Sequence, residues 1–349
     1  MPLKFLNFPY LVQEKIMENM EFSEIFLASL CSKRMKQSVI RARVAIPKTW
    51  FVVKEDSRLV GIKPDISYPA KMLIKMVEKP KIKKRKIIDV KIGEGCEVSA
   101  KIRAKYSNYE GHYCLLEVLQ IDKTMTKALL DHVKSIFKST QSFDLQMSAA
   151  KISDDLPIFE NVKDIYFPGA TSVLEVEVLE RFLEKYPKLQ SLNLQPIMNG
   201  LLTDTSKIFE IERVYSRNPG QIGKNLLLNF SGKSLELSNV IISETDIVDI
   251  IKKWVTNEGY QDLETLIIRM ASGCIIYTGR VFDALPEAEL FNPAIRSPNF
   301  YYDNKIIHTA SFNIEIDANS ACRDVIRPID GKRASIRCEY HQLTFVVWD

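Results

Sequence analysis

The chain has 349 residues, of which 46% are hydrophobic and 26% charged, and its formal net charge is +4 at pH 7. These are globular proportions, so we expect no long disordered region. No apolar run approaches the roughly 18 residues of a membrane span, and no apolar segment follows a basic start. This predicts a soluble protein of the cytoplasm, the nucleus or both. Six scattered cysteines predict reduced thiols and no disulfide scaffold.

Residues 8–43 have the pattern of three short helices, with predicted N-caps at Ser23 and Ser32 for the second and third. So small a module cannot bury all of its apolar side chains. Surplus apolar surface of this kind is usually covered by a partner. Ile25, Phe26 and Leu27 show the surplus most clearly, because they present apolar groups to nearly every side of the second helix.

The order of these residues resembles an F-box, the segment through which F-box proteins dock on the Skp-type adaptor of an SCF-type cullin ubiquitin ligase. The matching segments are Phe8-Pro9, Glu14-Lys15-Ile16 and Leu27 through Cys31-Ser32-Lys33-Arg34-Met35-Lys36. Phe8 stands where leucine is commoner. The resemblance implies a docking face, although some of its residues must also form the core of the module. Its nine residues are Phe8, Pro9, Val12, Ile16, Met20, Ile25, Leu27, Leu30 and Met35. The alternative is an ordinary three-helix cap that packs on the rest of the chain.

Residues 47–114 are predicted to be mainly β, because they contain β-branched runs such as Ile87–Ile92. Within residues 79–105, ten Lys and Arg stand against three Asp and Glu, a net charge of +7. The alternatives for this segment are a solvated loop, a nuclear import signal or acidic-partner contact, and a phosphate contact to nucleic acid. Aromatic residues for base stacking are almost absent from it. The candidate import signal comprises Lys81, Lys83, Lys84, Arg85 and Lys86.

From residue 115, helical stretches alternate with short apolar strands. The clearest repetition is Leu-x-x-Leu-x-Leu at 189–194 and its variant at 263–268, which begin 74 residues apart. Leucine-rich repeats recur about every 20–29 residues, so we predict an irregular repeat-like array with insertions such as residues 199–225. An ordinary α/β sheet is the alternative. The predicted substrate-binding residues, on exposed strand positions of this array, are Gln190, Asn193, Glu264 and Arg269.

The C-terminal stretch is predicted to form an antiparallel meander with a hairpin turn at Asp330-Gly331 and a final strand at 343–348. Residues 237–266 and the tail 330–348 resemble the F-box-associated type-2 region of the expanded nematode F-box family. Asp249 stands where that family commonly has asparagine. The resemblance implies that this region recognises a target protein.

The sequence offers no catalytic motif. It lacks the G-x-S-x-G elbow, the Walker A loop and a G-x-G-x-x-G turn after a strand. Two scattered groups of potential metal ligands lack the paired spacing of structural zinc sites: Cys96, His112 and Cys114, and Cys322, Cys338 and His341. We expect no enzyme activity, metal or cofactor.

The predicted fold is α+β to α/β. It has an F-box module (1–46), a mainly β region (47–114) and a leucine-rich-repeat-like helix–strand region that ends in a β meander (115–349). The predicted function is a substrate-recognition adaptor that binds a Skp-type adaptor, through it a cullin scaffold, and a target protein. The alternative is a non-catalytic interaction protein, binding nucleic acid through residues 79–105, with the N-terminal helices as a structural cap.

Overall fold

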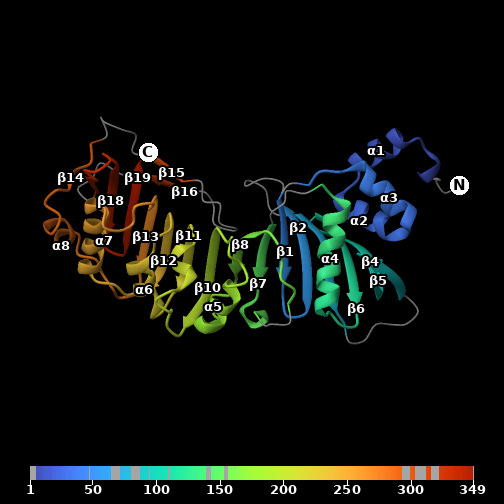
Figure 1. The fold of residues 1–349 in the computed structure, drawn as a ribbon, viewed down its shortest axis with the longest axis horizontal. Coiled ribbons are helices and arrows are strands. Elements are labelled where there is room, and N and C mark those ends of the chain that lie inside the picture. Colours follow the sequence, from blue (N-terminus) through green and yellow to red (C-terminus); the bar gives the residue numbers. More distant parts are fainter. Residues whose placement is uncertain are drawn as a thin grey trace. The chain divides into compact units, whose positions relative to one another are not determined.

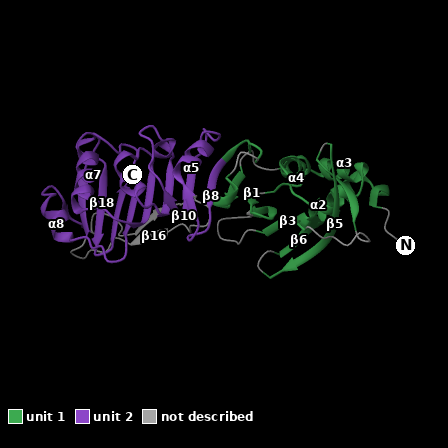
Figure 2. Cartoon of the chain, turned by 90° about the horizontal axis from the view of Figure 1, so that it is seen from below, with its two compact units in different colours: residues 1–162 green, residues 163–349 purple. Residues whose placement is uncertain are grey.

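The computed structural model describes residues 5–46, 48–63, 71–79, 87–93, 95–108, 111–138, 143–152, 156–292, 299–302, 312–315 and 322–348. The chain forms two compact units, residues 1–162 and 163–349 (Figure 2). Each unit contains a mixed β-sheet with helices packed on it. The three-part division expected from the sequence stays a prediction.

Three helices begin unit 1: α1 (Tyr10–Glu18), α2 (Phe22–Cys31) and α3 (Lys33–Ala42), after a 3₁₀ turn at Phe5–Asn7 (Figure 1). The cap at Ser32 is confirmed, because its Oγ accepts a hydrogen bond from the backbone N–H of Met35 at 3.1 Å. The cap at Ser23 is wrong. The N-cap of α2 is Glu21, whose N–H donates to the Glu24 carboxylate at 3.0 Å in a capping box.

The sheet of unit 1 has the strand order β4–β5–β6–β3–β2–β1–β7 among the described residues. The β3–β6 and β1–β7 pairs are parallel and the others antiparallel. Helix α4 (Lys123–Ile136) packs on β4 and β5, and α2 packs on β3, β4 and β6. The strands are β1 (Lys48–Val53), β2 (Ser57–Lys63), β3 (Lys71–Glu78), β4 (Ile88–Ile92), β5 (Cys96–Ser107), β6 (Gly111–Val118) and β7 (Phe143–Met147), with a 3₁₀ turn at Ala149–Lys151.

Unit 2 begins with parallel strands: β8 (Val162–Phe167), β10 (Ser191–Asn199), β11 (Arg213–Asn218), β12 (Ser234–Val240) and β13 (Thr265–Met270). The short strand β9 (Val173–Glu175) pairs with the end of β10. The connections contain α5 (Val176–Leu183), a 3₁₀ turn at Lys207–Glu210, α6 (Ile222–Asn229) and α7 (Glu244–Thr256). The expected insertion at residues 199–225 is wrong, because β11 lies within it and pairs with both neighbours.

The predicted antiparallel meander is confirmed. After α8 (Thr278–Asp283), strands β14 (Glu289–Leu290), β17 (Cys322–Ile326), β18 (Arg333–Glu339) and β19 (Gln342–Trp348) follow, and β19 pairs antiparallel with β13. A separate two-stranded pair consists of β15 (Asn299–Tyr302) and β16 (Phe312–Glu315). The turn at Asp330-Gly331 contains Gly331 with a φ of 72°, which glycine adopts without strain.

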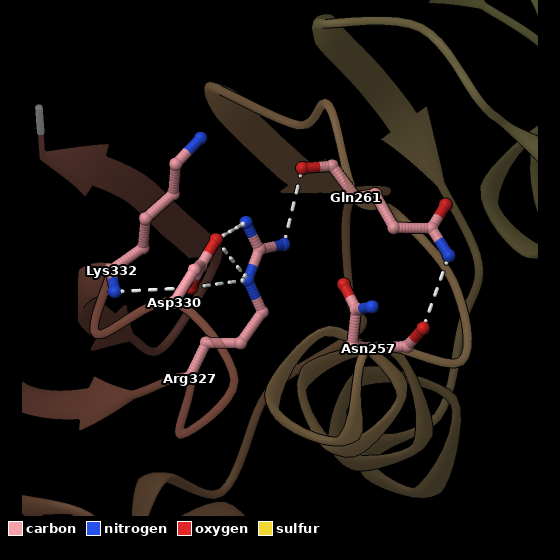
Figure 3. A network of polar contacts seen from close by, with 5 residues as sticks. All are labelled: Asn257, Gln261, Arg327, Asp330 and Lys332. Carbon is pink, nitrogen blue, oxygen red and sulfur yellow. Dashed lines mark hydrogen bonds and ion pairs between the residues drawn. The ribbon is translucent and has the colours of Figure 1, made fainter.

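Arg327 fixes this turn to the segment after α7 (Figure 3). Its guanidinium donates hydrogen bonds to both carboxylate oxygens of Asp330 and, at 3.1 Å, to the backbone carbonyl of Gln261. It also lies 4.9 Å from the ring centroid of the buried Trp254. The hydrogen bond from Arg327 lowers the pKa of Asp330 to about 2. All three donor nitrogens of this buried arginine are therefore paired.

Candidate functional site

Helix α1 presents apolar side chains to solvent. Leu11 is 70% exposed and Val12 41% exposed, whereas Met17 is completely buried. Leu11, Val12, Ile16 and Met20 line a shallow groove of about 670 Å³, with Lys15 and Asn19 at its sides. Because exposed apolar surface gains free energy when a partner removes it from water, this groove is a candidate protein-binding surface. We call it the α1 groove.

The nine predicted docking residues divide between surface and core. Pro9 and Val12 are exposed, and Phe8, Ile16, Met20, Leu27, Leu30 and Met35 are half-buried. Ile25 is completely buried within unit 1. The prediction did not include Leu11, because it followed a single stripe at four-residue spacing. The sequence could have indicated Leu11, because it directly precedes Val12 on the same helix. The two neighbours give the groove two adjacent rows of apolar side chains.

A buried histidine on α4, His132, connects helix α2 to the core of unit 1. The Gly93 N–H donates to Nδ1 of His132 at 3.0 Å, which leaves the proton on Nε2, 2.7 Å from the Ser29 hydroxyl. Ser29 in turn donates to the carbonyl of Phe26, and the Phe26 ring meets the imidazole edge-on. Burial, with a smaller effect of Lys36, lowers the pKa of His132 to about 4. The imidazole is therefore neutral, and it anchors α2 to the sheet.

Three of the basic residues in the described part of residues 79–105 share one buried carboxylate within unit 1. Glu117 is buried on β6 and pairs with Lys79 at 2.5 Å, Arg103 at 3.2 Å and Lys101 at 3.6 Å. These cations, Lys79 first, lower the pKa of the Glu117 carboxyl. The import-signal residues Lys81, Lys83, Lys84, Arg85 and Lys86 lie outside the described residues.

A larger cavity of about 1380 Å³ lies among α2, α3, the β4–β5 turn and α4. Its lining mixes charges, and Lys127 and Asp131 within it form an ion pair at 2.6 Å. The cavity therefore has no single electrostatic preference. Its charged side chains are Lys33, Lys36, Lys91, Lys123 and Lys127, and Asp89, Glu97 and Asp131.

The parallel strands of unit 2 have one apolar face and one polar face. Alternate residues such as Leu192, Leu194 and Leu237 are buried in the core, and the residues between them point the other way. Parallel sheets are usually covered on both faces, and several polar side chains of this second face are themselves buried, among them Ser191, Asn193 and Thr265. The polar face carries Asp164 and Tyr166 (β8), Ser191, Asn193 and Gln195 (β10), Arg213, Tyr215 and Arg217 (β11), Ser234, Glu236 and Ser238 (β12), and Thr265 and Arg269 (β13). On the same side of β13, Ile267 is apolar and packs in a buried cluster with Phe291, Cys322 and Val346.

Two of the four predicted substrate-binding residues, Asn193 and Arg269, belong to the polar face. The expected exposure is wrong for Asn193, which is 1% exposed because its strand lies within the sheet, and the other three are half-buried. Arg269 forms an ion pair with Glu236 and a 3.4 Å hydrogen bond to Ser238. Gln190 and Glu264 lie one residue before β10 and β13, and Gln190 donates to Glu212 at 3.4 Å. Tyr215 and Arg217 were not predicted, because β11 was not recognised as a strand. Tyr166, on β8, was not predicted either.

Within the described part of the chain, no three His, Cys, Asp or Glu side chains gather as a metal site. Cys114 and Cys338 are buried, which raises their thiol pKa values to about 12 and about 11. None of the helices in the described residues is both long and apolar enough to span a membrane.

Residues 5–44, which form α1, α2 and α3, match the family model of the F-box domain. The N-terminal three-helix unit is therefore an F-box, as its sequence suggested. Comparisons of the chain with curated proteins and with solved structures give no match.

Proposed function

We propose that this chain is the substrate-recognition adaptor of an SCF-type cullin ubiquitin ligase. The observation that carries the proposal is the F-box at residues 5–44 together with the exposed apolar groove on its first helix. An F-box without a partner would leave Leu11 and Val12 in water, whereas a Skp-type adaptor that covers them gains their burial.

The docking face comprises the groove residues Leu11, Val12, Ile16 and Met20 and the half-buried side chains of the α2–α3 region. Helix α1 is held on α3 by the Tyr10 hydroxyl, which donates to the carbonyl of Arg41 at 2.6 Å. Because α2 is anchored in unit 1, the F-box presents its outer surface from a fixed position on that unit. Ile25 contributes to this anchor and not to the docking face.

Unit 2 is the proposed target-binding region, with its polar face as the recognition surface. Register-matched residues Asp164, Ser191, Arg213, Ser234 and Thr265 stand on five successive parallel strands. This matched register supports the leucine-rich-repeat-like interpretation. That interpretation and the resemblance to the nematode type-2 region both remain part of the proposal.

The chain itself forms no covalent bond in this proposal. It holds a target lysine near the ubiquitin-conjugating enzyme that the cullin recruits, and so raises the effective concentration of the two reacting groups. Its partners are the Skp-type adaptor, through it the cullin scaffold, and a target protein. The import role of residues 81–86 stays a prediction.

The test is co-purification of the full chain with a Skp-type adaptor and a cullin scaffold, for the wild type and a Val12→Asp/Ile16→Asp variant. We expect retention by the wild type and loss in the variant. Ile158→Asp is the matched control, because Ile158 is 63% exposed and lies in unit 1 outside the F-box. Failure of the folded wild type to retain the adaptor would contradict the proposal.

A further inference from the structure

The sheet of unit 1 has a face on which basic and aromatic side chains stand together. Along β5 and β6, Ala100, Cys114 and Leu116 are buried in the core, on the side where α2 and α4 pack. The residues between them point the other way, and we call that side the outer face. On β3, β5 and β6 its register-matched members are Lys75 and Val77, Lys101, Arg103 and Lys105, and Tyr113, Leu115 and Glu117.

A first surplus of positive charge surrounds Glu117. Lys79, Lys101 and Arg103 all pair with this one buried carboxylate. One negative charge against three positive charges leaves two that are not neutralised. The side chains of Lys79 and Arg103 are 49% and 40% exposed, so a ligand in solution can reach them.

Two further lysines of the outer face have no acid opposite them. In the strand register, Lys75 stands opposite Leu115, and Lys105 stands opposite Tyr113. Lys105 is exposed and Lys75 is half-buried. Together with the two charges around Glu117, these two lysines give this part of the outer face a surplus of four positive charges.

The acids at the β4 end of the outer face have partners of their own. Ser99 donates to the Asp89 carboxylate at 2.6 Å, and Glu97 stands opposite Lys91 in the strand register. Lys91 offsets one of these two acids, so β3 to β6 keep a net positive charge of three on this face. The face is therefore complementary to a ligand with several negative charges.

Two aromatic side chains from outside the basic segment lie beside these cations. Tyr113 is the direct cross-strand neighbour of Lys105. Trp50 of β1 packs with Tyr113 against one buried cluster of β1, β2 and β3. A Cβ added to Gly61 of β2 would lie 2.7 Å from the Trp50 ring, so the glycine lets the indole lie against the strand. Strand register thus supplies the aromatic residues that the basic segment lacks in sequence.

We propose that the outer face binds single-stranded nucleic acid. Its cations contact the phosphates, and the half-buried rings of Tyr113 and Trp50 stack on bases through their open sides, a combination that recurs in proteins that bind single strands. An acidic protein would match the charge and leave the aromatic rings unused. This binding function is additional to the proposed adaptor function and does not rest on it.

The test is a fluorescence-anisotropy titration of a labelled oligouridine of about 12 nucleotides, a length that one such surface covers, with the full chain. We expect saturable binding, with a slope of about −2 to −3 in log affinity against log salt concentration, since three to four phosphates are neutralised. No binding by the folded chain would overturn the inference. Displacement of the oligonucleotide by polyglutamate at equal charge concentration would assign the face to an acidic protein and overturn it too.

Lys75→Gln/Lys105→Gln tests the charge of the outer face. The variant should bind more weakly, and its salt slope should become shallower by about 1.4, the contribution of two phosphate contacts. Lys188→Gln/Lys252→Gln is the matched control, because it removes the same charge from exposed lysines of unit 2. An equal loss of affinity in both variants would overturn the inference, because net charge alone would explain it.

Tyr113→Leu tests the stacking, because leucine keeps apolar packing on the buried cluster and removes the ring. Affinity for the oligouridine should fall about tenfold at an unchanged melting temperature. Tyr106→Leu is the control and should bind as the wild type does. Tyr106 is 63% exposed on β5 and contacts His112, on the side of these strands opposite to Tyr113. Wild-type affinity in Tyr113→Leu would overturn the inference.

Discussion

The α1 groove and the polar face of unit 2 have opposite chemistry. The groove is lined mainly by apolar side chains that solvent reaches, whereas the polar face has charged side chains that pair with each other, such as Glu236 and Arg269. Apolar burial is non-directional. A polar surface discriminates against a ligand that lacks matching partners. The comparison teaches that the two regions make different demands on a partner.

The largest expected effect breaks the apolar side of this comparison. Val12→Asp/Ile16→Asp places two charges in a surface that loses its water on docking, so affinity for the Skp-type adaptor should fall on the order of 100-fold or more. The measurement is a binding titration with the full chain. Wild-type affinity in the variant would show that the groove is not the docking surface.

The buried His132 tests how the α1 groove is supported. It anchors helix α2, which packs with α3 beneath the groove helix α1. Its folded pKa of about 4 lies below the ordinary value near 6.5, so the stabilisation is complete above about pH 6.5 and decreases as the pH falls toward 4. Between pH 7 and 5 the free energy of unfolding should fall by about 2 kcal/mol. Urea denaturation of wild type and His132→Gln would check this.

The His132→Gln variant cannot take up this proton, and its stability should be nearly constant over the same window. An equal pH dependence of wild type and variant would show that other groups cause the loss.

On the unit 2 side of the comparison, Arg327 donates hydrogen bonds through Nε, Nη1 and Nη2. Arg327→Leu should lower the free energy of unfolding by about 1.5 kcal/mol, because the Gln261 carbonyl and the Asp330 carboxylate lose a charged donor. Thermal melting of the full chain measures it. An unchanged free energy of unfolding would show that the hydrogen bonds of Arg327 do not stabilise the fold.

The local pattern predicted the elements whose signals lie within a few residues. The Ser32 cap, the Asp330-Gly331 turn and the final strand follow from side-chain chemistry and β propensity. The strand β11 was missed because its polar-face residues Arg213, Tyr215 and Arg217 conceal the apolar alternation that marks the other strands.

The candidate sites were predictable only in part. The F-box order indicated the docking helix, but the burial of Ile25 depends on contacts with sheet residues far away in the sequence. The pairing of Asn193 with Tyr166 and Tyr215 likewise depends on strand register, which a single sequence does not specify.

The most direct measurement is a calorimetric titration of the full chain with a Skp-type adaptor at several temperatures and at about 0.1 and 1 M salt, where screening differs strongly. Docking through the α1 groove predicts tight binding with a negative heat-capacity change and an affinity that depends little on salt. No binding by the folded chain, or an affinity that falls steeply with salt, would contradict the account.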